Sequence, residues 1–249
     1  MWGQNPLRQL WKNGKLPDGL PRWRRWPVLG LKLALGLFVV VHLYALAGRV
    51  VNPPVTLTMV ERWAQGMEVR RDWVPLSEIS PNLVSAVIAA EDSKFCDHEG
   101  IDPDAIELAL EEFREGQRLR GGSTITQQTA KNVFFWNGGG FVRKAGDAWL
   151  GLFIDFAWGK RRVMEVYLNV AEWGDGLFGV EAAAQARFGK SARDVTRREA
   201  ALLAAVLPSP HKWRVDPPGP YVSRRAGTLQ ARMNVVEGEG LWRCLVGEG

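Results

Sequence analysis

Residues 80–100 read SPNLVSAVIAAEDSKFCDHEG, and this stretch decides what fold we expect. The hydroxyl of Ser80 can accept a hydrogen bond at a helix N-terminus, and Pro81 suits the first helical position because no N–H is needed there. Apolar residues then recur at helical spacing as far as Ala90. The stretch therefore predicts a capped helix that buries one face and ends at two adjacent carboxylates, the first of which is Glu91.

The two carboxylates at the end of that helix are unfavourable in their local setting. Negative charge at a helix C-terminus opposes the helix dipole, at a cost of about 0.3–1 kcal/mol. Such misfits cluster at functional sites, and the same field favours the protonated form of Glu91, which suits a general acid or base. A simpler interpretation is a loop acid that pairs with Lys94 or His98, and these residues alone leave both interpretations open.

The rest of the chain after residue 80 carries mainly helical signals. Apolar residues at helical spacing recur between capping residues, and Thr196 with Glu199 forms a capping box before one of the segments. We therefore expect a mainly α domain over residues 80–249, and a stalk with a short strand over residues 52–79, where prolines, β-branched residues and charges mix. The further helices are expected to begin at Asp102 and to cover 123–133, 143–158, 160–169, 180–188, 197–207 and 222–235.

The N-terminal part of the chain combines a basic tail with an apolar run. Residues 1–27 carry six basic groups and one acid, so they account for the whole net charge of +5 and leave no basic surface elsewhere to predict nucleic-acid binding. Residues 28–51 are almost entirely apolar and long enough to cross a hydrocarbon core. The positive-inside rule then places the tail in the cytoplasm and residues 52–249 across the membrane.

Two other interpretations of the apolar run stay open. Ala45-Leu46-Ala47 resembles the cleavage site of a signal peptide, although 27 residues are a long polar lead for one. The run could also be a buried core helix, but Trp23 and Trp26 flank it where interfacial anchors belong. We expect an uncleaved transmembrane anchor.

The chain has two cysteines, Cys96 and Cys244, at positions far apart in the sequence. Two cysteines could pair in an oxidising compartment, but they do not make a disulfide framework. We expect two unpaired thiols.

Residues 120–132, RGGSTITQQTAKN, predict a helix with one polar stripe. Ser123, a natural cap, starts the stripe, and Gln127 and Lys131 follow at every fourth residue. Hydroxyl, amide and ammonium groups that begin at a helix N-terminus suit a phosphate or sugar ligand. A capped, solvated helix would show the same pattern.

Residues 143–147, RKAGD, place Arg143 and Asp147 one helical turn apart. Such a pair is most often an exposed salt bridge worth about 0.3–0.5 kcal/mol. Beside a phosphate site, Arg143 would instead supply a second cation and Asp147 a second carboxylate.

Five segments in order resemble the signature motifs of the family 51 glycosyltransferases: EDSKFCDHEG, GGSTITQQTAKN, RKAGD, KRRVMEVYLN and RREAALLAAVLPSP. Together they are similar to the monofunctional biosynthetic peptidoglycan transglycosylases. The resemblance implies a lysozyme-like helical glycosyltransferase domain, without a transpeptidase domain, in the bacterial inner membrane. It also implies the activity: lipid II is polymerised into glycan strands by inverting transfer, and undecaprenyl pyrophosphate is released.

The resemblance also implies roles for individual residues. Glu91 falls on the family's general base, which takes the proton from the 4-hydroxyl of the acceptor sugar. Lys131 and Arg143 fall on the cations that stabilise the departing pyrophosphate. The positions implied to bind substrate or frame its cleft are Ser123, Gln127, Gln128, Lys131, Arg143, Glu165, Tyr167 and Asn169.

Asp147 is the second candidate catalytic residue and departs from the family pattern, which is R-K-x-x-E. Its side chain is shorter by one methylene, and catalytic geometry is sensitive to roughly 1 Å. The carboxylate can still orient Arg143 or hold a divalent cation, Mg or Mn, near the pyrophosphate; the sequence requires no cofactor and assigns no metal ligand. Asp155, where close relatives often carry glutamate, is interpreted as structural.

The partners implied are lipid II, the growing glycan strand, the membrane and other cell-wall synthesis or cell-division proteins, but not nucleic acid. The segment VFFW, residues 133–136, is followed by three glycines and predicts an apolar lip that dips into the membrane interface. A core segment is the alternative.

Two other functions fit part of the pattern. A lysozyme-like glycosidase also uses an activated glutamate and a second acid, but cleavage of a neutral glycosidic bond does not need two cations. A membrane-tethered scaffold of the division machinery without activity is the alternative from another class. The tetrad at residues 209–212 matches the S-x-x-K of transpeptidases, but no K-T-G follows it.

Overall fold

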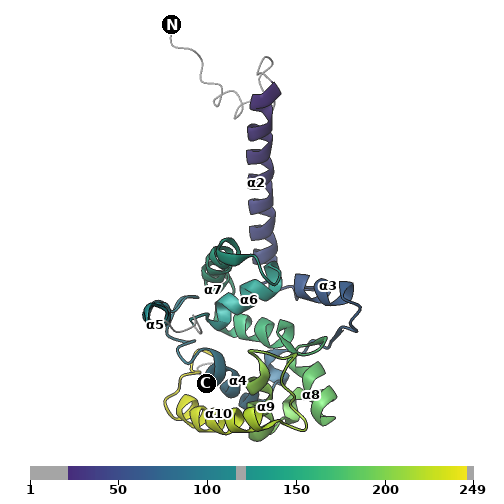
Figure 1. Ribbon diagram of the computed structural model, residues 1–249, viewed down its shortest axis with the longest axis vertical. Helices are drawn as coiled ribbons and strands as arrows, with labels where there is room; N and C mark the ends of the chain where they lie inside the picture. The colour runs from purple at the N-terminus through teal and green to yellow at the C-terminus, as the bar shows by residue number, and fades with distance from the viewer. Residues whose placement is uncertain (1–21, 116–121, 246–249) are drawn as a thin grey trace. The chain divides into compact units, whose positions relative to one another are not determined.

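The computed structural model describes residues 22–115 and 122–245, drawn as ribbon in Figure 1. These residues form two units, divided between Ala47 and Gly48. The described part of the first unit is helix α2, Arg22–Ala47.

Among the described residues, α2 is the helix that is long and apolar enough to cross a membrane. Its stretch Trp26–Ala47 has a mean hydropathy of 2.0. This finding confirms the predicted apolar helix near the N-terminus. The predicted basic tail lies mostly in residues 1–21, outside the described residues.

The second unit is mainly α, as predicted, with three short strands. Its elements are α3 Leu57–Ala64, β1 Arg70–Arg71, η1 Leu76–Glu78, α4 Pro81–Glu91, α5 Pro103–Arg114, α6 Ile125–Phe134, α7 Gly140–Val170, β2 Glu172–Gly174, β3 Leu177–Phe178, α8 Val180–Phe188, η2 Ala192–Asp194, α9 Arg197–Val206 and α10 Pro220–Gly238. Helices α4, α9 and α10 pack together, and α6 packs along α7 (Figure 1). These two groups hold the core.

Helix α4 ends at the residue that the sequence predicted. The Ser80 hydroxyl accepts a hydrogen bond from the backbone N–H of Asn82 at 3.3 Å, and Pro81 takes the first position. Every residue from Leu83 to Ala89 is buried. Because α9 and α10 cover this helix, it needs apolar residues on nearly all sides, which is why its sequence is apolar almost throughout.

The segment 52–79, which we predicted as a stalk, folds within the second unit. Strand β1 pairs in parallel with β3, through Arg70 opposite Leu177, and β2 pairs antiparallel with β3. Met59 and Leu76 are buried. The segment therefore packs on the domain through its strand pairing and through the buried side chains of Met59 and Leu76.

Helix α7 contains the two helices that we predicted, which meet at a kink. Residues 143–158 and 160–169 are continuous except at Gly159, which has φ 74° and ψ 162°. Glycine reaches positive φ without the steric cost that a Cβ would add. The sequence break therefore produces a kink and not a loop.

Exposed apolar side chains lie on α7 and on α3, whereas the predicted lip exposes mainly Trp136. Val133 is buried, and the Phe134 ring lies 6.4 Å from the ring of Trp158, so most of residues 133–136 pack against the domain; Trp136 is exposed. The name apolar surface is used below for the exposed side chains of Val142, Leu152 and Phe156 on α7 and of Leu57, Val60 and Trp63 on α3. Phe156 is 91% exposed.

Cys96 and Cys244 form a disulfide, with 5.5 Å between their Cα atoms, so the prediction of two unpaired thiols was wrong. The fold brings the turn after α10 against the loop after α4, although 148 positions separate the two cysteines. An ion pair between Arg243 and Asp97 holds the same two segments together. The positions of the two cysteines in the sequence do not indicate that these segments are in contact.

We expect the pair Cys96→Ser/Cys244→Ser to lower the free energy of unfolding by roughly 2–4 kcal/mol, because the cross-link restrains the unfolded chain. Denaturant unfolding in detergent measures this loss. The wild-type chain in reductant is the control and should unfold like the double variant. Unfolding of the variant at the denaturant concentration of the oxidised wild type would contradict the prediction.

Candidate active site

Glu91 is the last residue of α4, and its half-buried side chain turns toward α6. Its Oε2 accepts a hydrogen bond from Gln128 Nε2 at 2.8 Å, while its buried Oε1 has no partner among the described residues. Lys94 pairs with Asp104 at 2.7 Å, and His98 does not reach Glu91. The interpretation of Glu91 as an ordinary paired loop acid therefore does not hold.

The surroundings of Glu91 favour a carboxylate that can take up a proton. Burial raises the pKa of Glu91, and the hydrogen bond from Gln128 and the charges of Arg225 and Lys131 oppose this rise. A carboxylate with a raised pKa is a stronger base than an exposed one.

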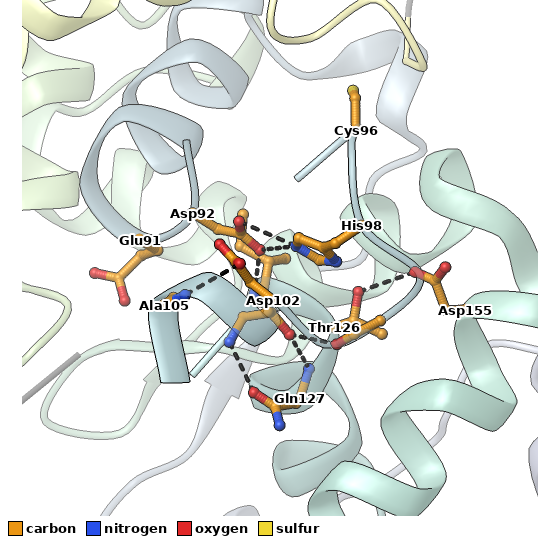
Figure 2. A network of polar contacts seen from close by, with 12 residues as sticks. Glu91, Asp92, Cys96, His98, Asp102, Ala105, Thr126, Gln127 and Asp155 are labelled. Atoms are coloured by element: carbon orange, nitrogen blue, oxygen red, sulfur yellow. Dashed lines mark hydrogen bonds and ion pairs between the residues drawn. The ribbon is translucent and has the colours of Figure 1, made fainter. Parts of the chain in front are cut away.

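Asp92, next to Glu91, has a different task. Its buried carboxylate accepts hydrogen bonds from the backbone N–H of Ile125 and from His98 Nε2, both at 3.0 Å. In Figure 2 the Glu91 side chain points away from this pair. The Asp92 carboxylate thereby fastens the end of α4 to the first turn of α6, a role that our sequence reasoning did not assign. The adjacency of the two acids was the available signal.

The cap of α6 is Thr124 and not Ser123, as we had predicted. Thr124 Oγ1 accepts from the backbone N–H of Gln127 at 3.1 Å, and Gln127 Oε1 accepts from the N–H of Thr124 at 3.0 Å. The side-chain oxygen of Gln127 is thus used by the capping box. Ser123, one residue earlier, is left to line the cavities described below.

Gln128 links Glu91 to a buried tyrosine. Its amide donates to Glu91, and its Oε1 accepts from the hydroxyl of Tyr167 at 3.2 Å. Burial, with the nearby charge of Glu91 adding to it, holds the pKa of Tyr167 well above its usual value. Tyr167 therefore stays a hydrogen-bond donor and fixes which end of the Gln128 amide faces Glu91.

Three cavities meet at Gln128. The catalytic cavity, of about 770 Å³, is lined by Glu91 and by Trp213, Tyr221 and Arg225. The cationic cavity, of about 310 Å³, shares Ser123 and Gln128 with it. The other residues that line the cationic cavity are Gln127, Lys131, Arg143, Lys144 and Asp147.

A third cavity, of about 310 Å³, lies on the other side of Gln128 and Lys131. Its walls include Arg62, which is paired with Glu172 at 3.0 Å, and His211, which lies 3.2 Å from the same carboxylate. Polar groups therefore line each of the three cavities that meet at Gln128.

The cationic cavity gathers the predicted phosphate-binding residues. Burial and the charge of Arg143 lower the pKa of Lys131, and the carboxylate of Asp147 opposes this effect. Burial raises the pKa of Asp147, although Arg143 forms an ion pair with it. Asp147 Oδ1 is buried without a partner among the described residues. The shorter acid still reaches Arg143 and leaves an excess of positive charge in the cavity.

Glu165 and Asn169, predicted to frame the cleft, line none of these cavities. Glu165 Oε2 accepts from the backbone N–H of Leu76 at 3.0 Å. Asn169 is fully buried and exchanges two hydrogen bonds of 2.9 Å with the backbone of Val74. These side chains satisfy the backbone of the segment before α4, and their role in substrate binding stays a prediction.

Asp155 also serves the fold, as interpreted from the sequence. It pairs with Lys160 at 2.7 Å and accepts a hydrogen bond from Thr126 Oγ1 at 3.1 Å (Figure 2). The hydrogen bond with Thr126 joins the middle of α7 to the first turn of α6.

The helical domain carries a partly buried carboxylate beside a cavity rich in cations, an arrangement that suits an enzyme with acid–base chemistry on an anionic substrate. Comparison with known proteins identifies its family: the model described as "Transglycosylase" matches residues 58–236, from α3 to α10. The chain belongs to the transglycosylase family.

Several curated relatives carry the same description, biosynthetic peptidoglycan transglycosylase. The protein of Rhodospirillum centenum is 50% identical over 212 residues, which cover 85% of this chain and 92% of the relative. That of Caulobacter vibrioides is 48% identical, over 87% of this chain and 93% of its own length. That of Shewanella oneidensis is 46% identical, over 81% and 88%.

We expect Asn169→Ala to lower the free energy of unfolding by roughly 2–4 kcal/mol, because it leaves buried backbone groups of Val74 without partners. The KM of the folded variant should change by less than about twofold, since Asn169 lies away from the cavities. Denaturant unfolding and steady-state kinetics measure the two effects. Ser123→Ala, at the cavity wall, is the comparison and should change KM with little effect on stability. A large change in KM for Asn169→Ala would instead support its predicted role in substrate binding.

Proposed function

We propose that this chain polymerises lipid II into glycan strands of peptidoglycan and releases undecaprenyl pyrophosphate. The observation that carries the proposal is the position of Glu91 on a cavity that shares Ser123 and Gln128 with the cationic cavity. The names of the relatives and the family support the peptidoglycan substrate.

The reaction needs a base at the nucleophile and positive charge at the leaving group. Glu91 takes the proton from the 4-hydroxyl of the acceptor sugar, and that oxygen bonds to the anomeric carbon of the donor. The bond from this carbon to the pyrophosphate oxygen breaks, and the electron pair leaves with the pyrophosphate. Lys131 and Arg143 stabilise the negative charge that develops there. Attack from the side opposite the leaving group inverts the anomeric centre.

The two cavities share part of their wall, which suits a base in one cavity and the leaving group in the other. A donor with its pyrophosphate at Lys131 and Arg143 has its first sugar beside Ser123 and Gln128, within reach of the cavity that Glu91 lines. Hydrolysis of a neutral glycosidic bond would leave the two cations without a task. The cation pair therefore favours transfer from a pyrophosphate donor over a glycosidase.

Asp147 orients Arg143 in this proposal. It is the one carboxylate among the described residues that line the cationic cavity, where Lys131, Arg143 and Lys144 surround it. The described residues contain no group of three or more His, Cys, Asp or Glu that could hold a metal ion. A single carboxylate among three cations is a poor ligand set for Mg or Mn, so no step is assigned to a metal.

We propose that the N-terminus is cytoplasmic and that the domain lies in the periplasm of a single-pass inner-membrane protein. The basic residues before the apolar run support this orientation. The disulfide between Cys96 and Cys244 supports it independently, because disulfides persist in oxidising compartments. Other cell-wall synthesis and cell-division proteins stay expected partners.

We also propose that the apolar surface on α3 and α7 contacts the bilayer. Val142 and Phe156 of α7 are 86% and 91% exposed, and with Leu152 they recur at helical spacing. Exposed apolar patches commonly mark membrane or protein contact sites. Contact at this surface would hold the domain close to a lipid-linked substrate.

We expect Glu91→Gln to lower kcat at least about a hundredfold, because the amide cannot accept the proton. Labelled lipid II incubated with the full chain, followed by separation of the glycan products, measures the rate. Glu107→Gln, which removes an exposed carboxylate from α5, is the matched control and should polymerise at the wild-type rate. Normal polymerisation by Glu91→Gln would show that Glu91 is not the general base.

The pH profile of the wild type gives a second readout of the same assignment. Burial raises the pKa of Glu91, so the base is lost as pH falls through a value above the ordinary glutamate pKa of about 4.3. Burial lowers the pKa of Lys131, so its charge is lost as pH rises toward a value below about 10.4. We expect a bell-shaped profile of kcat/KM.

We expect Leu152→Ser/Phe156→Ser to weaken vesicle binding of residues 48–249 by at least about tenfold, because each side chain loses a contribution of about 1.5–3 kcal/mol from apolar burial. Co-sedimentation with anionic lipid vesicles measures the loss. Ile106→Ser, on an exposed position of α5, is the control. Equal binding by the wild type, the double variant and the control would show that the apolar surface does not contact the membrane.

A further inference from the structure

Two arginines of α10 lie beside Glu91, and the reaction described above does not use them. Arg225 lines the catalytic cavity together with Glu91. Arg232 lines a neighbouring cavity of about 410 Å³, which Glu91 also borders. The arginines are seven positions apart, so they lie on one face of the helix, about 10 Å apart along its axis.

Neither arginine has an ion-pair partner in the described part of the chain. Arg225 Nε is buried without a hydrogen-bond partner there. The arginine of the cationic cavity, in contrast, is paired with Asp147. Buried donors are normally satisfied, and an unpaired guanidinium at the wall of a substrate cavity indicates an anionic ligand.

Aromatic rings complete the wall beside Arg225. Trp213 and Tyr221 line the same cavity, with their ring centroids 4.6 Å apart. Aromatic faces give a sugar ring an apolar surface, and a few polar groups then fix its orientation. The cavity thus combines a surface for sugars with a cation for a carboxylate.

The order of the cavities gives this surface a direction. The cationic and catalytic cavities share Ser123 and Gln128, and the catalytic and α10 cavities share Ala90 and Glu91. A sugar chain whose pyrophosphate lies in the cationic cavity therefore passes Glu91 and continues along α10.

We propose that Arg225 and Arg232 form a docking track for the peptide carboxylates of the growing glycan strand. The inference rests on the proposed function, because a strand of disaccharides that each bear an acidic peptide is the product of that reaction. Guanidinium groups bind carboxylates in a two-pronged geometry that ammonium groups cannot match. The spacing of the arginines is close to the length of one disaccharide, so successive peptides meet successive arginines while the sugars pack on Trp213 and Tyr221.

The test measures binding of glycan strands by the full chain in detergent, without turnover. Three fluorescent probes are compared by anisotropy: uncross-linked strands with their peptides, the same strands with the carboxyl groups amidated, and strands from which an amidase has removed the peptides. The variants are Arg225→Gln and Arg232→Gln. Arg224→Gln is the matched control, since it removes an exposed charge from the same helix and lines neither cavity.

For the peptide-bearing probe, Kd should rise roughly tenfold in Arg225→Gln and roughly threefold in Arg232→Gln, and it should not change in Arg224→Gln. The amidated and peptide-free probes should bind all four proteins alike. Equal loss for all three probes, or an equal effect of Arg224→Gln, would overturn the inference. Thermal unfolding of each variant identifies any loss of binding that comes from misfolding. In that case Arg225→Lys and Arg232→Lys replace the glutamine variants, because they keep the charge but not the two-pronged geometry. Each should show a smaller rise in Kd, for the peptide-bearing probe alone.

The outcome is separable from that of the proposed function. Failure of the wild type to polymerise lipid II would refute the function, while the binding comparison would still be readable. Polymerisation by the wild type with probe-independent binding would refute the track alone.

Discussion

The hydrogen bonds of the Asp92 carboxylate set the geometry on which the site depends. This buried side chain accepts from the backbone N–H of Ile125 and from His98, and so joins the end of α4 to the start of α6. The first N–H groups of a helix lack partners within the helix and carry partial positive charge. Asp92 opposes the dipole of its own helix but satisfies that of the next one. With the two ends joined, Glu91 meets Gln128, and Lys131 follows one turn further along α6.

Local features of the fold could be predicted because local interactions decide them. The Ser80 cap, the capping box of Thr196 and Glu199, and the end of α4 at Glu91 are all set within a few residues of sequence. The break at Gly159 falls between the two helices that were predicted, and the cap of α6 at Thr124 lies one residue after the predicted cap. The disulfide and the packing of residues 52–79 were not predictable, since both depend on which distant segments the fold brings together.

The residues of the candidate site also differ in how far the sequence could predict their contacts. Glu91, Gln128, Lys131 and Arg143 were assigned from motif order, and the structure brings them to adjoining cavities. Glu165 and Asn169 belong to a similar motif, yet their polar atoms satisfy the backbone near Val74 and Leu76. A polar side chain looks the same in sequence whether it binds a ligand or a distant backbone group. The partner of its polar atoms distinguishes the two, and that partner is known only in the folded chain.

The charges around Glu91 follow from these positions. Burial raises the pKa of this carboxylate, and neighbouring cations lower it. Lys131 stands on the α6 side and Arg225 on the α10 side, and both oppose the rise in the pKa of Glu91 without forming an ion pair with it. Anions that bind these cations would reduce this opposition. The base would then be strongest when pyrophosphate and strand are both in place, which is when a proton has to be taken from the acceptor.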